Sequence, residues 1–324
     1  MRILHVLAYP IYETGGLMIY VKNLVIHLKK IGIQSDVICT DLKNPKNYTQ
    51  NINGINVYYI KNYGDFLKIN PIFNVIPFLQ KNKNNYDLIH VHYYIHFSSI
   101  QACLWCILNK KKVVLTFHGG VQTDLRSSGI KDNLFLIFKK IIFDPILGKF
   151  MIKKVDALSS VSKLDILQTN RIFHINRKKN NFYIPNAIEK DFFQDLNYEI
   201  VKEFKEKYNL NIKERRYISF IGRLSMIKGF DLFLKIMHEV NKTIKNIPIL
   251  IIGEGELERL IQNYKNLNII HIKKISYSKI RYIYHSIKIY VLTSRYEGFP
   301  TTILEALTTK TLVVSSNVGG VNEI

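Results

Sequence analysis

Cysteine is scarce in this chain of 324 residues. Only Cys39, Cys103 and Cys106 occur, and this odd number, in a chain without secretory features, implies no disulfide framework. Met1 leads directly into the apolar segment from Ile3 to Leu7, without the charged start, apolar stretch and small-residue cleavage site of a signal peptide. No repeat of fixed period is visible. We therefore expect a globular protein of the reducing cytoplasm.

Long segments without charge are also scarce. The best candidate for a membrane span runs from Leu88 to Leu108, which is long enough to cross a bilayer. It carries His90, His92 and His96, side chains that are costly to place in lipid. We therefore expect a buried strand from Leu88 to His92, then a loop, then a buried helix.

Cys103 and Cys106 form a CxxC pair within that segment, with histidines nearby. A structural zinc site is one reading of the pair. The reading that we favour is two buried, small apolar residues at helical spacing beside Leu104 and Ile107.

Acidic residues are few relative to basic ones. The chain has 46 Lys and Arg against 25 Asp and Glu, a formal net charge of +21, and its pI is near 9.7. Such an excess suits an anionic partner, either nucleic acid or a membrane surface. The cations are spread along the chain, and no nucleic-acid motif or aromatic-interleaved basic stripe occurs, so we expect no nucleic-acid partner.

The segment from Leu134 to Lys154 is the best candidate for membrane contact. It combines apolar and basic side chains, namely Phe135, Phe138, Ile141, Ile142 and Phe150 beside Lys139, Lys140, Lys149, Lys153 and Lys154. Such a segment can lie on an anionic membrane surface. Pro145 and Gly148 interrupt it, and a core helix with a solvated basic face is the alternative.

Strands that alternate with amphipathic helices indicate an α/β protein with parallel sheets. At this length two domains are the default. We expect domains at 1–190 and 216–324, joined by a connecting segment with one helix at 191–215. The expected strands are 3–7, 36–40, 57–60, 88–92, 113–117 and 157–161 in the first domain, and 217–221, 249–252, 269–272, 287–292 and 312–315 in the second.

Glu297 and Glu305 are spaced as E-x7-E within EGFPTTILEA. Gly298 and Pro300 indicate a turn from strand to helix, with Pro300 in the first helical turn and a threonine as cap. Glu297 then lies in the loop and Glu305 about one turn inside the helix, while Leu304 and Leu307 pack inward. Two such carboxylates can accept hydrogen bonds from sugar hydroxyls while helix amides meet phosphate; two solvated helix charges are the alternative.

Arg223 and Lys228 fall in a second predicted loop from strand to helix, between Gly222 and Gly229. In open α/β sheets, ligands bind at the carboxyl ends of strands, where such a loop places its side chains. A guanidinium and an ammonium there suit a pyrophosphate, and the glycines permit close approach of the backbone. The alternative is that Arg223 and Lys228 are ordinary surface cations.

These motifs together resemble the retaining, nucleotide-sugar-dependent glycosyltransferases of the GT-B class known as family 4. The resemblance runs through most of the chain, in order. It comprises MRILHVLAYPIYETGG, HVH at 90–92, LTFHGG at 115–120, VDALSSVS at 155–162, YIPNAI at 183–188, FIGRLSMIKG, LIIGEGE, EGFPTTILEAL and VVSSNVGGVNEI. GEGELE at 253–258 lacks the third glycine of a dinucleotide fingerprint, and we interpret it as a turn after a core strand.

The resemblance implies a GT-B fold, two doubly wound Rossmann-like domains facing across a cleft, with an N-terminal acceptor domain and a C-terminal donor domain. Family members continue beyond Ile324, so the second domain is expected to be incomplete. The implied activity is transfer of a sugar, of the hexosyltransferase type, from a nucleoside diphosphate sugar to a glycan or lipid-linked acceptor. The implied setting is biosynthesis of a surface polysaccharide, such as lipopolysaccharide or capsule, or of a glycolipid, in the cytoplasm or peripherally on the inner face of the plasma membrane.

The resemblance also implies residue roles. The amides of Gly15 and Gly16 face the donor phosphates, and His118 lies beside the transferred sugar. Arg223 and Lys228 stabilise the departing diphosphate. The remaining assignments are that Glu297 orients the sugar with the Gly298 and Phe299 amides, and that Glu305 holds the ribose. The rival for His118 is a core imidazole, and the rival for the glycines is a plain turn.

The chain contains no Asp-x-Asp pair, which metal-dependent nucleotide-sugar enzymes commonly use. A mechanism that needs no metal and no further cofactor is implied. Asn186-Ala187 departs from the family's usual Asn-Gly. Two other readings stay open, a GT-B epimerase or phosphorylase-like enzyme and a non-catalytic basic protein that binds membrane or nucleic acid.

Overall fold

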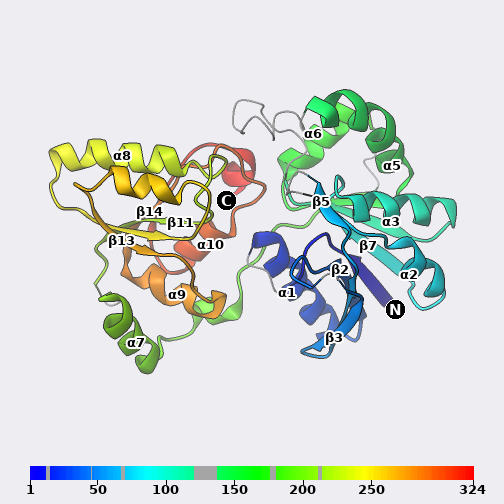
Figure 1. Cartoon of the computed structure of the whole chain (residues 1–324), viewed down its shortest axis with the longest axis horizontal. Coiled ribbons are helices and arrows are strands. Elements are labelled where there is room, and N and C mark those ends of the chain that lie inside the picture. Colours follow the sequence, from blue (N-terminus) through cyan, green and yellow to red (C-terminus); the bar gives the residue numbers. More distant parts are fainter. Residues whose placement is uncertain (12–14, 45, 67–69, 120–136, 176–179, 211–213) are drawn as a thin grey trace. The chain divides into compact units, whose positions relative to one another are not determined.

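The computed structural model describes residues 1–11, 15–44, 46–66, 70–119, 137–175, 180–210 and 214–324. The chain forms two compact units, and it passes from the first to the second between Pro185 and Asn186. Figure 1 shows each unit as a sheet with helices on both faces. The prediction of an α/β fold is thus confirmed in both units.

The first unit contains an eight-stranded sheet in the order β10-β9-β8-β7-β1-β2-β4-β3. Its strands are β1 (Arg2–Val6), β2 (Gln34–Thr40), β3 (Tyr48–Ile52), β4 (Ile55–Ile60), β7 (Leu88–His92), β8 (Val113–Phe117), β9 (Ala157–Ser160) and β10 (Asn181–Tyr183). All pairs are parallel except β3 with β4. This antiparallel hairpin, missed by the sequence analysis, turns at Asn53 and Gly54, both with positive φ. A separate short pair, β5 (Gly64–Phe66) with β6 (Asn70–Ile72), was also missed.

Helices cover both faces of this sheet. They are α1 (Gly16–Lys30), α2 (Ile76–Lys81), α3 (Phe97–Leu108), the π-helix η2 (Lys139–Gly148), α5 (Lys149–Lys154) and α6 (Lys163–Phe173). Helix α1 buries Met18, Val21 and Val25 against β2 and β4, while α2, α3 and α5 pack on the larger apolar cluster of the other face. Gly32, with φ of +80, ends α1 as its sequence position predicts.

The uncharged run at 88–108 forms strand β7 and helix α3, as predicted. Cys103 and Cys106 are buried free thiols within the apolar cluster, and burial raises the pKa of both. Within the described residues, neither thiol belongs to a group that could hold a metal ion. The favoured reading of the CxxC pair is therefore confirmed. No described helix has the length and apolar character that crossing a bilayer requires.

The basic segment ending at Lys154 differs from its prediction in one respect. Lys139 is buried, and its Nζ donates to Asp144 Oδ2 at 2.7 Å. The π-helical hydrogen bonding of η2 explains the error, because it brings residues five apart, rather than three or four, to the same face. The segment packs one face into the core, and its exposed face carries both large apolar side chains and lysines. Phe135 lies outside the described residues.

The second unit contains five parallel strands in the order β13-β12-β11-β14-β15. They are β11 (Tyr217–Ile221), β12 (Pro248–Ile252), β13 (Asn268–Ile272), β14 (Ile287–Leu292) and β15 (Leu312–Ser315). The helices are η3 (Lys190–Phe193), α7 (Tyr198–Tyr208), α8 (Phe230–Thr243), η4 (Glu258–Asn263), α9 (Tyr277–Ser286), α10 (Thr301–Thr308) and η5 (Gly319–Glu323). Helix α8 covers one face of the sheet, with α9 and α10 on the other (Figure 1).

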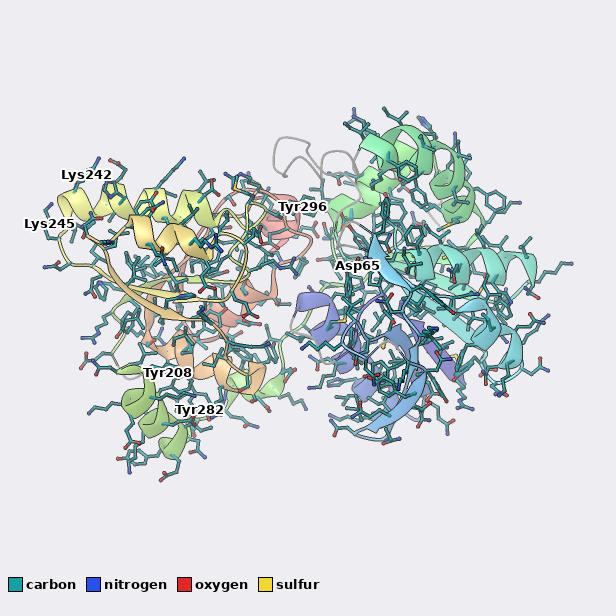
Figure 2. All side chains as sticks on the ribbon, in the orientation of Figure 1. Asp65, Tyr208, Lys242, Lys245, Tyr282 and Tyr296 are labelled. Atoms are coloured by element: carbon teal, nitrogen blue, oxygen red, sulfur yellow. The ribbon has the colours of Figure 1, made fainter. Side chains whose placement is uncertain are left out.

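The segment after residue 190 packs onto this second sheet's helices. Phe204 of α7 is buried and stacks on Tyr282 of α9 at 6.3 Å between ring centroids, and Tyr208 flanks it at 5.7 Å (Figure 2). Arg281 donates to the backbone carbonyls of Asp191 and Gln194. The helices η3 and α7 are thereby fixed to the second unit.

Candidate functional site

Two cations lie in the loop between β11 and α8, as predicted. Arg223 is exposed, and its guanidinium has no ion pair or hydrogen bond with any described residue. Lys228 has a partner: its Nζ donates to both oxygens of Glu297, at 2.7 and 2.9 Å. The loop therefore offers one unpaired guanidinium and one ammonium already held by a carboxylate.

Glu297 lies in the loop between β14 and α10, and it is only 7% exposed. Ser294 Oγ also donates to Glu297 Oε1, at 2.6 Å. Strands β11 and β14 are parallel neighbours, so the loops after them emerge at the same edge of the sheet. This adjacency brings Lys228 to Glu297 across 69 residues of sequence.

Close backbone contacts fix the loops of this edge. Gly229 has φ of +66, and a Cβ there would lie 1.8 Å from the carbonyl oxygen of Thr293. Gly319 has φ of +55, and its Cβ would lie 1.7 Å from the carbonyl oxygen of Glu297. Both positions therefore require glycine. The loop after β11, the loop after β14 and the final loop of the chain are held together at Glu297.

The two backbone amides that come after Glu297 in the chain are those of Gly298 and Phe299. Within the described part of the chain, neither amide donates a hydrogen bond. The carbonyl of Phe299 accepts from Asn186 Nδ2 at 2.7 Å. Neither Asn186 nor Ala187 has a positive φ, so the loss of the family's glycine at 187 imposes no strain. The two free N–H groups beside a carboxylate suit a ligand with oxygen acceptors.

The start of α10 differs from its prediction. Pro300 is the N-cap rather than a residue of the first turn, and no side chain caps the helix. Thr302 bonds elsewhere, because its Oγ1 accepts from the Tyr290 hydroxyl at 2.9 Å. The buried face of the helix was also misassigned. Leu307 is exposed and Leu304 partly so, whereas Ile303, Glu305 and Ala306 are buried.

Glu305 is the more deeply buried carboxylate, at 3% exposure. The hydroxyls of Tyr277 and Tyr284 donate to it, at 3.2 and 2.9 Å. Burial raises the pKa of Glu305 from 4.5 to about 7, although the tyrosine hydrogen bonds act in the opposite direction. Both Glu305 and Glu297 add to the rise that burial causes in the Tyr290 pKa, so Tyr290 lies near both carboxylates. The reading of two solvated charges is wrong.

His118 follows β8 in the first unit and ends a chain of three imidazoles. Its Nε2 lies 3.1 Å from His92 Nδ1, and His92 Nε2 lies 3.0 Å from His5 Nδ1. Tyr20 packs edge-on against the His118 ring, at 4.8 Å. Burial, followed by repulsion from His90, lowers the pKa of His118 to about 3. A neutral His118 is therefore held in orientation by its neighbours.

The imidazoles behind His118 were not predicted from the sequence. His5 and His90 are register partners on β1 and β7, and His90 Nε2 lies 2.6 Å from Thr116 Oγ1. His5, His90 and His92 place nitrogens within 4.8 Å of one another. The signal available was alternation: His90 and His92, two residues apart in a strand, must share one face. Which strand lay beside them could not be read from the sequence.

Gly15 and Gly16 are exposed at the N-terminus of α1. A Cβ at either position would meet no atom within 4 Å. Packing therefore does not require glycine here, and the two residues stand at a helix N-terminus, the kind of position at which anions bind.

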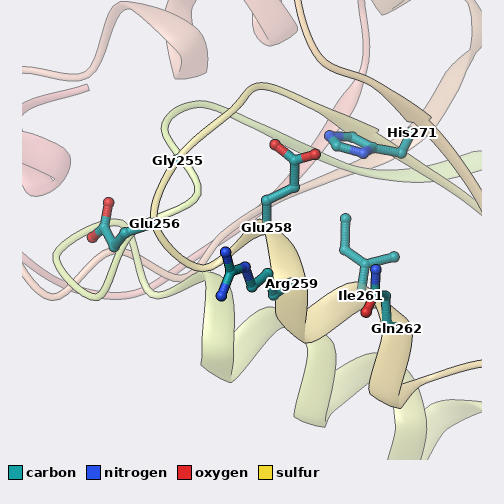
Figure 3. Close-up of a pocket in the computed structure, with 7 residues that line it drawn as sticks. All are labelled: Gly255, Glu256, Glu258, Arg259, Ile261, Gln262 and His271. Carbon is teal, nitrogen blue, oxygen red and sulfur yellow. The ribbon is translucent and has the colours of Figure 1, made fainter.

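A cavity of about 570 Å³ in the second unit lies apart from the predicted residues (Figure 3). Its lining comes from the segment 255–262 and from His271, and it includes Glu258 and Arg259. Gly255, at its rim, packs against the backbone of Leu224, where a Cβ would lie 2.5 Å from the carbonyl oxygen. The GEGELE segment is thus a turn after strand β12, as predicted, and it supports the loop of Arg223.

Comparison with known proteins decides the family. The family described as Glycosyltransferase Family 4 matches residues 14–192, more than half of the chain. The family described as Glycosyl transferases group 1 matches residues 201–324. The chain belongs to glycosyltransferase family 4. The resemblance of its motifs is thereby confirmed, and this glycosyltransferase is an enzyme rather than a non-catalytic basic protein.

Individual relatives agree with the family. The glycosyltransferase is 27% identical to an uncharacterized glycosyltransferase of Methanocaldococcus jannaschii, with 100% of the chain and 82% of the relative covered. Two solved structures share its fold. A sucrose-phosphate synthase from Thermosynechococcus elongatus has a TM-score of 0.71 at 17% identity, covering 99% of this chain and 82% of that one. The E. coli trehalose-6-phosphate protein bound with UDP-2-fluoro glucose has a TM-score of 0.70 at 13% identity, covering 100% and 86%. The predicted GT-B fold is confirmed.

Proposed function

We propose that this glycosyltransferase takes its sugar from a nucleoside diphosphate sugar bound at the carboxyl edge of the second unit's sheet. The observation that carries the proposal is the pairing of Lys228 with Glu297, in a loop that also holds Arg223, whose guanidinium has no partner among the described residues. One loop thus offers positive charge for a diphosphate, and the next offers a carboxylate for sugar hydroxyls. The UDP-sugar in the E. coli structure of the same fold supports this class of donor.

Each residue of the site has its own proposed role. Arg223 and Lys228 bind the diphosphate and stabilise the charge that develops on it as the glycosidic bond breaks. Glu297 and the free amides of Gly298 and Phe299 orient the sugar. Glu305, held by two tyrosines, binds the ribose hydroxyls. Since its pKa is about 7, its carboxyl is a donor as well as an acceptor near neutral pH.

The first unit holds the acceptor and supplies the remaining residues of the proposal. His118 orients the transferred sugar as a neutral imidazole, and the amides of Gly15 and Gly16 bind donor phosphate. The acceptor is a glycan or lipid-linked sugar of a surface polysaccharide or glycolipid. Work on such an acceptor places the enzyme in the cytoplasm, peripherally on the inner face of the plasma membrane.

We include in the proposal that transfer retains the anomeric configuration and needs no metal. Cationic side chains and helix amides take the charge of the leaving diphosphate, a task that a divalent ion performs where an Asp-x-Asp pair holds one. Transfer that continues in excess chelator, with a product of unchanged anomeric configuration by NMR, is the expected result. Abolition by chelator and restoration by Mg²⁺ would contradict it.

The donor site is tested by thermal stabilisation with UDP, GDP and ADP, each with and without its sugar. A ligand at a hundredfold excess over its Kd should add about 2.7 kcal/mol to the free energy of unfolding. We expect one nucleotide to stabilise the protein, and Arg223→Ala to remove the effect.

Arg259→Ala is the matched control, because Arg259 is exposed in the same unit but lines the other cavity. If stabilisation is lost in this variant and kept in Arg223→Ala, the nucleotide binds in that cavity instead. Free nucleotide released in step with sugar transfer separates a transferase from an epimerase or phosphorylase-like enzyme.

A further inference from the structure

A row of large apolar side chains stands exposed on the helical segment that runs from Ile137 through η2 and α5. Ile141 is 67% exposed and Ile146 is 69% exposed. The other exposed members of the row are Ile137, Phe138, Ile142 and Phe150. The same segment buries Phe143, Met151 and Ile152 in the core of the first unit. Its fold is therefore anchored by one face, while the other leaves an apolar surface in water, where burial would be favourable.

Lysines border this apolar row. Lys140, Lys153 and Lys154 are exposed, and Lys149 is partly exposed. Asp144 is the sole acidic residue in the segment 137–154, and it is buried with Lys139. The exposed face thus carries positive charge and no negative charge. A helix with an apolar row edged by lysines is the pattern of a peptide that lies in the interface of an anionic membrane.

A basic cavity of about 490 Å³ adjoins the row. Phe150 of the row and Lys154, which borders it, both line the cavity, and Lys110, Lys111 and Lys112 of the turn after α3 complete the basic lining. Its one acidic residue, Asp156, pairs with Lys112 at 3.1 Å. The three other lysines have no acidic partner among the described residues. The cavity thus has the charge and the size to receive a phosphate group.

We infer that this surface docks the enzyme on an anionic phospholipid bilayer. The lipid phosphates occupy the basic cavity, and the side chains from Ile137 to Phe150 enter the boundary with the acyl chains. A second copy of the chain is a poorer occupant, because a symmetric pairing would bring the lysines of one copy against those of the other. This surface would hold the enzyme at the membrane location that the proposed function includes. It does not require sugar transfer, because binding is measured without donor or acceptor.

The test is co-sedimentation of the full chain with vesicles of phosphatidylcholine, with and without one third phosphatidylglycerol. One variant, Ile141→Ser with Ile146→Ser, removes apolar contact. The other, Lys110→Gln with Lys154→Gln, removes cavity charge. The matched controls are Ile31→Ser with Leu312→Ser, whose side chains are 71% and 65% exposed elsewhere, and Lys242→Gln with Lys245→Gln at the end of α8 (Figure 2).

We expect the wild type to bind anionic vesicles at about 0.15 M salt and to release them as salt rises. Changing the lysine pair should weaken binding about tenfold or more, since each lysine near an anionic surface contributes on the order of a fivefold change in affinity. Changing the isoleucine pair should weaken binding to a similar extent, because two apolar contacts with the bilayer are lost. The control pairs should bind as the wild type does.

Three results would overturn the inference. They are no binding of the wild type to anionic vesicles, test pairs that bind as tightly as their controls, or a wild-type dimer that Ile141→Ser with Ile146→Ser converts to a monomer. Thermal melting of each variant checks its fold, and the lysine pair, fully on the surface, keeps the test valid should the isoleucine pair melt early. Stabilisation by nucleotide on the same samples reports the donor site separately.

Discussion

Lys228 Nζ lies 2.7 Å from one oxygen of Glu297 and 2.9 Å from the other, and this contact joins the loops that follow β11 and β14. Glu297 is buried, whereas the Lys228 side chain is about one third exposed. The lysine therefore keeps access to a ligand while it holds the carboxylate in place. In the proposed function, the lysine of this pair binds the diphosphate and the carboxylate binds the sugar.

Lys228→Ala should lower kcat about a hundredfold, because groups that stabilise charge developing in the transition state have effects of that order. Nucleotide affinity should fall less than kcat. Steady-state kinetics and calorimetry with the identified nucleotide measure the two quantities. Lys245→Ala is the control, and equal kinetics for both variants would remove Lys228 from the proposed role.

Glu305→Gln should change how stability depends on pH. The folded-state pKa is about 7, above the ordinary 4.5. A raised carboxyl pKa means that the folded state holds its proton while the unfolded state loses it, so stability falls as pH rises from about 4.5 to 7. The difference corresponds to about 3 kcal/mol. Urea unfolding at several pH values should show this loss in the wild type and not in Glu305→Gln; parallel curves would contradict a buried, neutral Glu305.

Acid should destabilise the first unit through its histidines. Burial lowers the pKa of His5 and His92 well below 6.5, so the folded state keeps them neutral. Below pH 6.5 the unfolded state takes up protons that the folded state does not, and stability falls with pH. One such histidine costs about 2 kcal/mol at pH 5. In His5→Phe the loss of stability between pH 7 and pH 5 should be smaller than in the wild type. If NMR shows that His118 titrates near pH 6.5, the row of neutral histidines is refuted.

Gly319→Ala should displace the backbone of Glu297. The added Cβ would meet the Glu297 carbonyl oxygen at 1.7 Å, and φ of +55 is unfavourable for alanine. We expect a loss of about 1 kcal/mol or more in the free energy of unfolding, with weaker nucleotide binding. Gly16→Ala, whose Cβ meets nothing within 4 Å, is the control for stability. Unchanged melting and nucleotide affinity in Gly319→Ala would show that the contact relaxes freely.

Much of the framework was predictable because strand formation depends on local patterns. The expected strands at 88–92, 113–117, 217–221, 287–292 and 312–315 agree with the structure at both ends. The edge hairpin of β3 was missed because its residues are mostly exposed and polar, so no apolar run marks it. Its Asn53-Gly54 turn was the available signal.

Side-chain directions within helices were less predictable. Lys139 was placed on the surface and Leu307 in the core, and the structure reverses both. Lys139 turns inward because η2 is a π-helix, whose spacing no simple apolar period reveals. Leu307 turns outward because Glu305 and Ala306 take the inner face of α10.

The sequence by itself determined the alternation of strands and helices, the loops that hold Arg223, Lys228 and Glu297, and the family motifs. Local apolar patterns and glycines encode these features. Only the tertiary structure decided that Lys228 reaches Glu297 and that Glu305 lies buried beneath two tyrosines. These contacts depend on which parallel strands are neighbours and on which helix covers them, and both follow from long-range packing.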